Sequence, residues 1–145
     1  MLVLAIDSSS STATCALVSE KGVLGEINLN DKKQHSVLLM DLIDDLLKYN
    51  NLKIKDLDGF AISEGPGSFT GLRIGMATVK GLSFGSKKPS VCVSSLDALA
   101  YNISGFNGII CPIIDALRRN VYASLYKKEG DELISLSEKE CISLT

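Results

Sequence analysis

Two short segments place an aspartate after an apolar run and before a polar turn. Asp7 precedes Ser8 and Ser9, and Asp115 follows an apolar run much later in the chain. A carboxylate and hydroxyls beside free backbone amides can hold Mg²⁺ and phosphate. An ordinary β-turn, in which Asp and Ser bond their own backbone, explains the same residues. Both interpretations, a nucleotide site and a structural turn, stay open.

A glycine-rich segment over residues 63–75 joins an apolar run to a helical pattern. No Gly-Lys-Ser/Thr follows it, so the Walker pattern fails. Its amides, with the N-terminus of the next helix, could still bind an anion. Ser68 or Thr70 could instead be the N-cap of that helix. The candidate nucleotide or phosphate site therefore comprises Asp7, Ser8, Ser9, Gly65, Gly67 and Asp115.

Small residues recur inside the helix that follows this turn. Gly71, Gly75, Thr78 and Gly81 lie three or four positions apart. Each glycine in a helix costs about 0.5–1 kcal/mol relative to alanine, so three of them need a reason. Close packing of another backbone is the simplest explanation. The packed partner belongs either to the same chain or to a different one, and both readings stay open.

The chain lacks the residues that several kinds of catalytic or binding site require. His35 is the one histidine of the chain, whereas a zinc hydrolase normally uses two. A Gly-x-Ser-x-Gly elbow is absent, so no serine triad is predicted. The chain has 15 basic and 17 acidic residues, without a long Lys/Arg block. Nucleic-acid binding depends on clustered basic residues, so we expect none by this chain alone.

The cysteines and the N-terminus indicate a reducing compartment. Cys15, Cys92 and Cys111 lie in apolar runs, and we expect them to be buried like small hydrophobic residues. The cysteines are widely spaced in the sequence, so we do not expect a disulfide framework. The apolar run after Met1 is short and has no charged leader, so we expect neither a signal peptide nor a membrane span. These features predict a cytoplasmic protein.

Apolar periodicity predicts an α/β fold with a mixed sheet. Strands are expected at 2–6, 13–19, 23–29, 58–63 and 89–93, and helices at 36–49, 70–84 and 96–101. A second meander follows, with strands at 108–114, 121–126 and 132–136. Because it repeats the opening order of strands, we expect one lobe over residues 1–105 and the start of a second, incomplete lobe over 106–145.

These motifs together resemble the TsaB (YeaZ) family. The resemblance rests on Leu4–Ser9, on His35-Ser36, on Gly65–Gly75, on Ser95–Leu99, and on Ile114–Ala116 followed by Val121-Tyr122. It covers nearly all of the chain, and the glycine-rich segment is its most specific part. It implies the fold of sugar kinases, heat-shock ATPases and actin, a ribonuclease H-like lobe.

The resemblance also implies a function and partners. The family takes part in making threonylcarbamoyladenosine at position 37 of tRNA, as a non-catalytic partner of its paralogue TsaD, with the ATPase TsaE. It implies self-dimers, indirect contact with tRNA, and no cofactor of its own, with ATP or ADP and Mg²⁺ acting in the complex. Older names describe the group as glycoprotease-like.

The resemblance further implies that the first two helices form the pairing surface. On this chain that surface comprises Leu39, Ile43, Leu46, Gly71, Arg73, Ile74, Gly75, Thr78, Gly81 and Leu82. A rival hypothesis is a nucleotide-dependent hydrolase or transferase centred on Asp7 and Asp115.

The chain departs from the family pattern at three places. Val37 stands where Glu is usual, Asp41 where Pro is usual, and Leu117 where Arg is usual. The family is also normally longer, which puts nucleotide binding by this chain in question.

Overall fold

The computed structural model describes residues 1–30, 35–103 and 105–144, which form two compact units. The first unit comprises Met1–Glu64 and Ser68–Val93, and the second comprises Gly65–Gly67 and the chain from Ser94 onward. We had expected the boundary after residue 105. It lies earlier because the third helix makes its hydrogen bonds with the second unit, through Asp97 and Tyr126.

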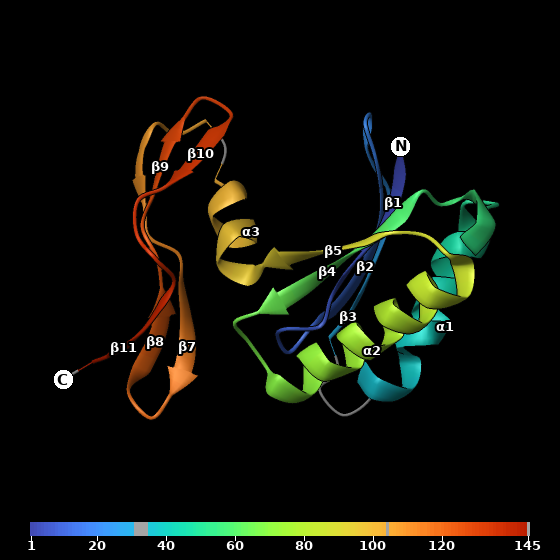
Figure 1. Ribbon diagram of the computed structural model, residues 1–145, viewed down its shortest axis with the longest axis horizontal. Coiled ribbons are helices and arrows are strands. Elements are labelled where there is room, and N and C mark those ends of the chain that lie inside the picture. The colour runs from blue at the N-terminus through green and yellow to red at the C-terminus, as the bar shows by residue number, and fades with distance from the viewer. Residues whose placement is uncertain (31–34, 104, 145) are drawn as a thin grey trace. The chain divides into compact units, whose positions relative to one another are not determined.

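The first unit contains a five-stranded mixed sheet, in the order β3-β2-β1-β4-β5 (Figure 1). Its strands are β1 (Leu2–Asp7), β2 (Ala13–Ser19), β3 (Gly22–Leu29), β4 (Gly59–Gly65) and β5 (Ser90–Ser94). The first three form the predicted antiparallel meander, with Ile6 opposite Cys15. β4 runs parallel to β1, with Ile6 opposite Ile62. The α/β fold and its mixed sheet are therefore as the periodicity predicts.

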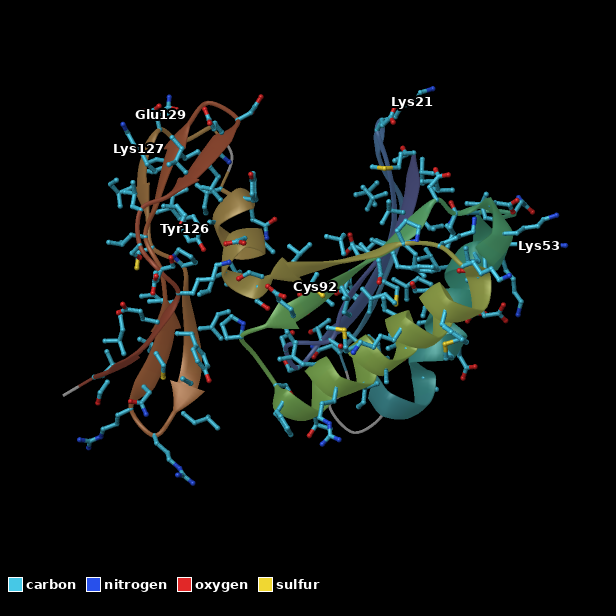
Figure 2. The ribbon with its side chains drawn as sticks, in the orientation of Figure 1. Lys21, Lys53, Cys92, Tyr126, Lys127 and Glu129 are labelled. Atoms are coloured by element: carbon cyan, nitrogen blue, oxygen red, sulfur yellow. The ribbon has the colours of Figure 1, made fainter. Side chains whose placement is uncertain are left out.

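Burial of the cysteines is only partly as predicted. Cys15 on β2 is buried, but Cys92 on the edge strand β5 is exposed (Figure 2), and so are Cys111 and Cys141. The expectation for Cys92 and Cys111 was wrong. For Cys92, an apolar run does not distinguish a central strand from an edge strand, whose side chains have a neighbouring strand on one side only. Cys111 lies between two strands rather than within one.

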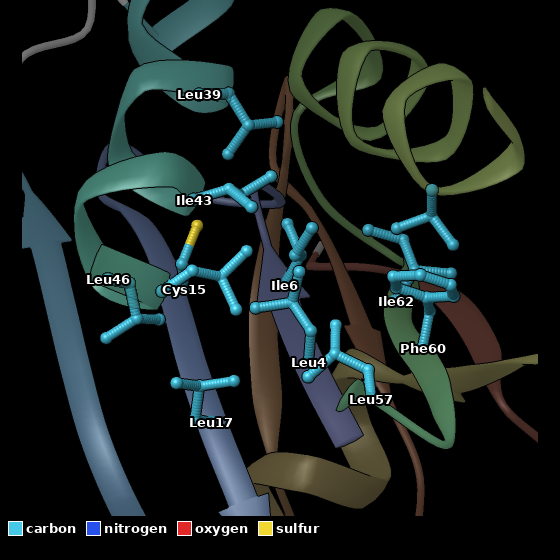
Figure 3. Packing of buried hydrophobic residues seen from close by; sticks show 12 residues of the cluster. Leu4, Ile6, Cys15, Leu17, Leu39, Ile43, Leu46, Leu57, Phe60 and Ile62 are labelled. Atoms are coloured by element: carbon cyan, nitrogen blue, oxygen red, sulfur yellow. The ribbon is translucent and has the colours of Figure 1, made fainter. Parts of the chain in front are cut away.

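Helices α1 (His35–Tyr49) and α2 (Phe69–Ser86) cover one face of this sheet. Side chains of the same face on β1, β2 and β4 meet those of α1 in a continuous apolar core (Figure 3). The core residues are Leu4, Ile6, Cys15, Leu17, Leu39, Ile43, Leu46, Leu47, Leu57, Phe60, Ile62 and Val79. A short 3-10 helix, Ile54–Asp56, connects α1 to β4.

The ends of α2 extend slightly beyond the predicted range. Ser68 is its N-cap, and the Ser68 hydroxyl accepts a hydrogen bond from the Gly71 amide at 3.3 Å. The helix continues through Gly85 to Ser86, two residues beyond the predicted range of 70–84. It stops because Lys87 takes the left-handed conformation, at φ 57°, and so provides the C-cap.

The second unit combines α3 (Ser95–Tyr101) with two three-stranded antiparallel sheets. One sheet has the order β10-β9-β6 and the other β11-β8-β7. The strands are β6 (Gly108–Ile110), β7 (Ile113–Leu117), β8 (Asn120–Ala123), β9 (Tyr126–Glu129), β10 (Glu132–Ser135) and β11 (Glu140–Ser143).

Two predicted strands of this unit, 108–114 and 121–126, are each divided between the two sheets. Pro112 has no N–H to donate to a ladder, which explains the first break. At the second break, the Leu125 amide donates to the Ser137 hydroxyl at 2.9 Å instead of to a neighbouring strand.

Among the described residues, no helix is long and apolar enough to cross a membrane.

Candidate functional site

The β1–β2 loop lies directly against the first two turns of α2. The buried Ser8 hydroxyl donates to the Gly71 carbonyl at 2.8 Å. A Cβ on Gly71 would come within 1.9 Å of the Ser8 carbonyl oxygen, and a Cβ on Gly75 within 2.3 Å of Ser8 Oγ. Gly71 and Gly75 are therefore required by packing within the chain. The sequence left open whether the backbone packed against these glycines belongs to the same chain or to another. It belongs to the same chain, so Gly71 and Gly75 do not form a docking surface for another protein.

The amides of the glycine-rich turn also have partners within the protein. The Ser68 amide donates to the Ser9 carbonyl at 2.6 Å, which ties the turn to the β1–β2 loop. Gly65 ends β4 with φ at 99°, a conformation that glycine adopts without strain. Gly67 immediately precedes the N-cap residue. This geometry supports the structural reading of the turn, a sharp change of direction from strand to helix.

Both candidate aspartates close their own turns. Asp7 Oδ1 accepts from the Ser9 amide at 2.8 Å, and Asp115 Oδ1 accepts from the Leu117 amide at 2.8 Å. These are Asx turns, in which the carboxylate bonds the backbone two residues further on. Asp7 belongs to the first unit and Asp115 to the second. Within the described ranges, no group of three or more His, Cys, Asp or Glu residues could hold a metal ion.

Three of the residues predicted for a partner surface lie in the core. Leu39, Ile43 and Leu46 are only 1–2% exposed, and all three belong to the apolar cluster beneath α1. They are unavailable to a partner, so this part of the prediction is wrong. The apolar stripe of α1 is the face that packs on the sheet, as such stripes usually are. The side chain of His35 lies outside the described residues.

The α2 residues of the predicted surface divide between two faces. Ile74 and Leu82 are half-buried and pack against the core, and Thr78 is also half-buried. Arg73 and Gly81 are exposed, and a Cβ on Gly81 would have no heavy atom within 4 Å. The small residues of this helix therefore serve different faces: Gly71 and Gly75 face inward, and Gly81 faces outward.

The outward face of α2 carries large apolar side chains that sequence reasoning missed. Phe69 is 74% exposed and Phe84 is 89% exposed. They begin and end a stripe at helical spacing, which we name the α2 outer stripe: Phe69, Arg73, Ala77, Lys80, Gly81 and Phe84. The Arg73 guanidinium lies over the Phe69 ring, 5.4 Å from its centroid. Positions opposite Gly71, Gly75 and Val79 on a helical wheel would have identified this stripe.

The outward face of α1 is mainly charged. We name it the α1 outer face: Met40, Asp41, Asp44, Asp45 and Lys48, all exposed. Lys48 pairs with Asp44 at 2.5 Å, one helical turn away. This hydrogen bond and the charge of Asp44 raise the pKa of Lys48. Because α1 and α2 pack side by side on one sheet face, their outward residues form a single surface.

A polar network joins α3 to the sheets of the second unit. The buried Tyr126 hydroxyl donates to Asp97 Oδ1 at 2.6 Å, and Lys139 Nζ donates to Asp97 Oδ2 at 2.8 Å. Burial alone would raise the pKa of Asp97, but the hydrogen bonds from Lys139 and Tyr126 outweigh it and hold that pKa below its ordinary value. Burial and the bond to Asp97 raise the pKa of Tyr126 to about 12.

Comparison with known proteins agrees with this architecture. A family model described as TsaD: tRNA N6-adenosine threonylcarbamoyltransferase matches residues 20–145. The chain is 42% identical over 127 residues to the tRNA threonylcarbamoyladenosine biosynthesis protein TsaB of Bacillus subtilis strain 168, covering 88% of this chain and 56% of that protein. The chain belongs to the TsaB (YeaZ) family.

Solved structures of the TsaB family share the fold. YeaZ from Pseudomonas aeruginosa superposes with a TM-score of 0.85 at 28% identity, covering 97% of this chain and 67% of that one. A putative N-acetylmannosamine kinase from Listeria monocytogenes gives a TM-score of 0.55 at 15% identity, covering 92% and 49%, and shows the fold alone. The chain thus shares the α/β fold of YeaZ and of this kinase. The chain spans a little over half the length of its Bacillus TsaB relative.

Proposed function

We propose that this chain is a non-catalytic subunit in the formation of threonylcarbamoyladenosine on tRNA. Its TsaB relatives carry that pathway in their names, and the matching family model is that of the transferase. The observation that supports a non-catalytic role is the hydrogen bonding of the two candidate aspartates. The carboxylates of Asp7 and Asp115 each accept a hydrogen bond from a backbone amide of their own turn. Each turn thus accounts for its aspartate without a bound nucleotide, so neither carboxylate needs a catalytic role to explain its position.

The proposed action is to bind TsaD through the surface formed by the α2 outer stripe and the α1 outer face. Phe69 and Phe84 support this because large exposed aromatic side chains at helical spacing are typical of protein interfaces. Between them, Ala77 and Gly81 leave the backbone of α2 open to close approach. The chain contributes this surface and the transferase contributes the chemistry.

The remaining parts of the proposal concern partners and cofactors. TsaE joins the complex, self-dimers form in its absence, and the chain needs no cofactor of its own. ATP or ADP and Mg²⁺ act at the level of the complex. With 15 basic against 17 acidic residues, the chain contacts tRNA only through its partners. In this proposal the chain acts in the cytoplasm, together with the tRNA-modifying complex.

Replacing the Asp7 carboxylate separates the subunit role from the rival enzyme role. Asp7→Asn keeps a side-chain oxygen for the Ser9 amide but removes the charge that would bind a metal ion. Threonylcarbamoyladenosine formation by the complete complex should continue at the wild-type rate with this variant. A large loss of activity, together with ATP turnover by the isolated wild-type chain, would favour a nucleotide-dependent enzyme centred on Asp7.

A further inference from the structure

The two edges of the sheet in the first unit differ in how they are protected from pairing with another strand. The sheet ends in β3 on one side and in β5 on the other (Figure 1). Edge strands of native proteins usually carry a charge, a proline or a bulge that discourages such pairing. β3 carries Glu26, and its pairing with β2 shifts register between Leu17 and Val18. Residues Ser90–Ser94 of β5 include neither a charge nor a proline, so this edge is unprotected.

The backbone groups of β5 that point away from the sheet are those of Ser90 and Cys92. The Pro89 carbonyl accepts a hydrogen bond from the Phe60 amide at 3.0 Å, so it points toward β4. Successive residues of a strand direct their backbone groups to alternate sides, so the odd-numbered residues of β5 bond toward β4 as well. The N–H and C=O groups of Ser90 and Cys92 therefore face the free side, where no described strand follows β5.

The side chains of β5 are also exposed. Val91 is 57% exposed and Val93 is 39% exposed, and the Cys92 thiol is exposed. Because side chains alternate along a strand, the two valines share one face. Exposed β-branched side chains beside free backbone groups are the features that an added strand uses for docking.

The sequence of β5 indicates what that added strand is. Ser-Val-Cys-Val-Ser reads the same in both directions, with Cys92 at its centre. A two-fold axis through Cys92 places β5 of two copies antiparallel, so that every residue lies opposite one of its own type. The two Cys92 residues then exchange both of their backbone hydrogen bonds, and Val91 lies opposite Val93 of the other copy at the closer, non-hydrogen-bonded position. Such β-branched pairs stabilise a sheet, and no like charges meet.

We propose that a second copy of this chain pairs with β5 along this edge, antiparallel and centred on Cys92, so that the sheets of the two copies become continuous. The pairing uses neither the α2 outer stripe nor the α1 outer face, so it goes beyond the proposed function and is compatible with TsaD binding. The paired strands are short, so the dimer is weak, with a Kd of about 10–100 µM.

Sedimentation velocity of the Ala77→Arg chain tests the pairing, because this substitution disturbs association through the α2 outer stripe. The chain should still form dimers at about 500 µM, well above the expected Kd. Cys92→Pro removes an outward N–H and leaves the hydrogen bonds to β4, so the Kd should rise at least about tenfold. Cys92→Val keeps the amide and is the matched control, which should dimerise like its parent.

A second variant decides the matter if the proline variant does not fold. Val91→Lys with Val93→Lys places lysines opposite lysines, and the Kd should again rise at least about tenfold. Val23→Lys with Leu24→Lys adds the same charge at exposed positions of β3 and should change nothing. Circular dichroism checks that each variant is folded. The proposal is overturned if the Ala77→Arg chain is monomeric at about 500 µM, or if the folded lysine variant dimerises normally.

Disulfide formation tests the register. Opposed Cα atoms of the Cys92 pair would lie about 5.5 Å apart, within the range of about 4.4–6.8 Å that a disulfide spans. With Cys111→Ala and Cys141→Ala, mild oxidation by copper phenanthroline should link two chains through Cys92. A chain that keeps the exposed Cys141 in place of Cys92 is the control and should link far more slowly. Equal rates in the two chains would overturn the register. Each of these results is independent of whether Ala77→Arg weakens TsaD binding, so failure of the proposed function leaves the pairing intact.

Discussion

The Ser8 hydroxyl donates to the Gly71 carbonyl at 2.8 Å, across 63 residues of sequence, and Ser8 fills the space where a side chain on Gly71 would lie. This contact fixes the start of α2 against the β1–β2 loop. It assigns the loop, which resembles a phosphate site in sequence, to positioning a helix. The outward stripe of that helix is thereby held at a defined orientation on the sheet.

Two alanine substitutions on α2 should have opposite effects on stability. In Gly71→Ala the new Cβ meets a backbone oxygen at 1.9 Å, and strain of this kind costs about 1–3 kcal/mol. In Gly81→Ala the Cβ meets nothing within 4 Å, so the better helix former should stabilise the fold by about 0.5–1 kcal/mol. Urea unfolding of both variants measures this difference. Equal effects at the two positions would contradict the inward and outward assignment.

The clash at Gly75 should depend on the hydroxyl of Ser8. Gly75→Ala places a Cβ at 2.3 Å from Ser8 Oγ and at 2.9 Å from Ile62 Cδ1, whereas Ser8 Cβ, at 3.5 Å, is in ordinary contact. The first clash is the more severe, and Ile62 Cδ1 is the end of a side chain that can shift. Ser8→Ala removes the oxygen at a cost of about 0.5–1.5 kcal/mol for its hydrogen bond. The double variant should therefore be more stable than the sum of the single losses predicts, by about 1 kcal/mol or more. Strict additivity in this cycle would show that the two residues do not meet.

The second unit should lose stability in acid through Asp97. In the unfolded chain the pKa of this carboxyl is about 4, and its pKa in the folded protein is lower. The stabilisation is therefore fully present above about pH 4 and is lost as the pH falls through the folded value. Lys139→Met should reduce the acid sensitivity. Tyrosine fluorescence suits the measurement, since three of the four tyrosines lie in the second unit. An unchanged pH profile in Lys139→Met would count against the network.

The four cysteines should differ sharply in reactivity. Burial raises the pKa of the Cys15 thiol to about 12, so it carries almost no thiolate at pH 8. Cys92, Cys111 and Cys141 are exposed. Titration of the native protein with a disulfide reagent should modify these three quickly and Cys15 only after unfolding. Rapid modification of all four thiols would mean that the core around β2 is open.

The apolar periodicity of the sequence predicted the helices and strands better than it was used to predict which of their faces are buried. The meander of β1–β3 and helices α1 and α2 follow from local apolar patterns, which short-range physics largely determines. The same pattern on α1 indicates that Leu39, Ile43 and Leu46 face the core, although the family resemblance led us to assign them to a partner. The division of the predicted strand 108–114 at Pro112 could also have been predicted, because proline rarely occurs inside a paired strand.

Other features required the three-dimensional contacts. The need for Gly71 arises from Ser8, 63 residues away, and local spacing does not contain that information. The use of Asp7 and Asp115 as turn residues likewise depends on which amide each carboxylate accepts from. The exposure of Phe69 and Phe84 becomes clear once the buried side of α2 is known.

Isothermal titration of TsaD from the same organism tests the central claim, docking through the α2 outer stripe, most directly. Ala77 is exposed in the middle of the stripe, so Ala77→Arg disturbs a docked partner without entering the core. Ala98→Arg, at an exposed alanine of α3, is the matched control. The account predicts that Ala77→Arg weakens binding at least about tenfold while Ala98→Arg binds like the wild type. Equal affinity of the wild type and both variants would contradict it.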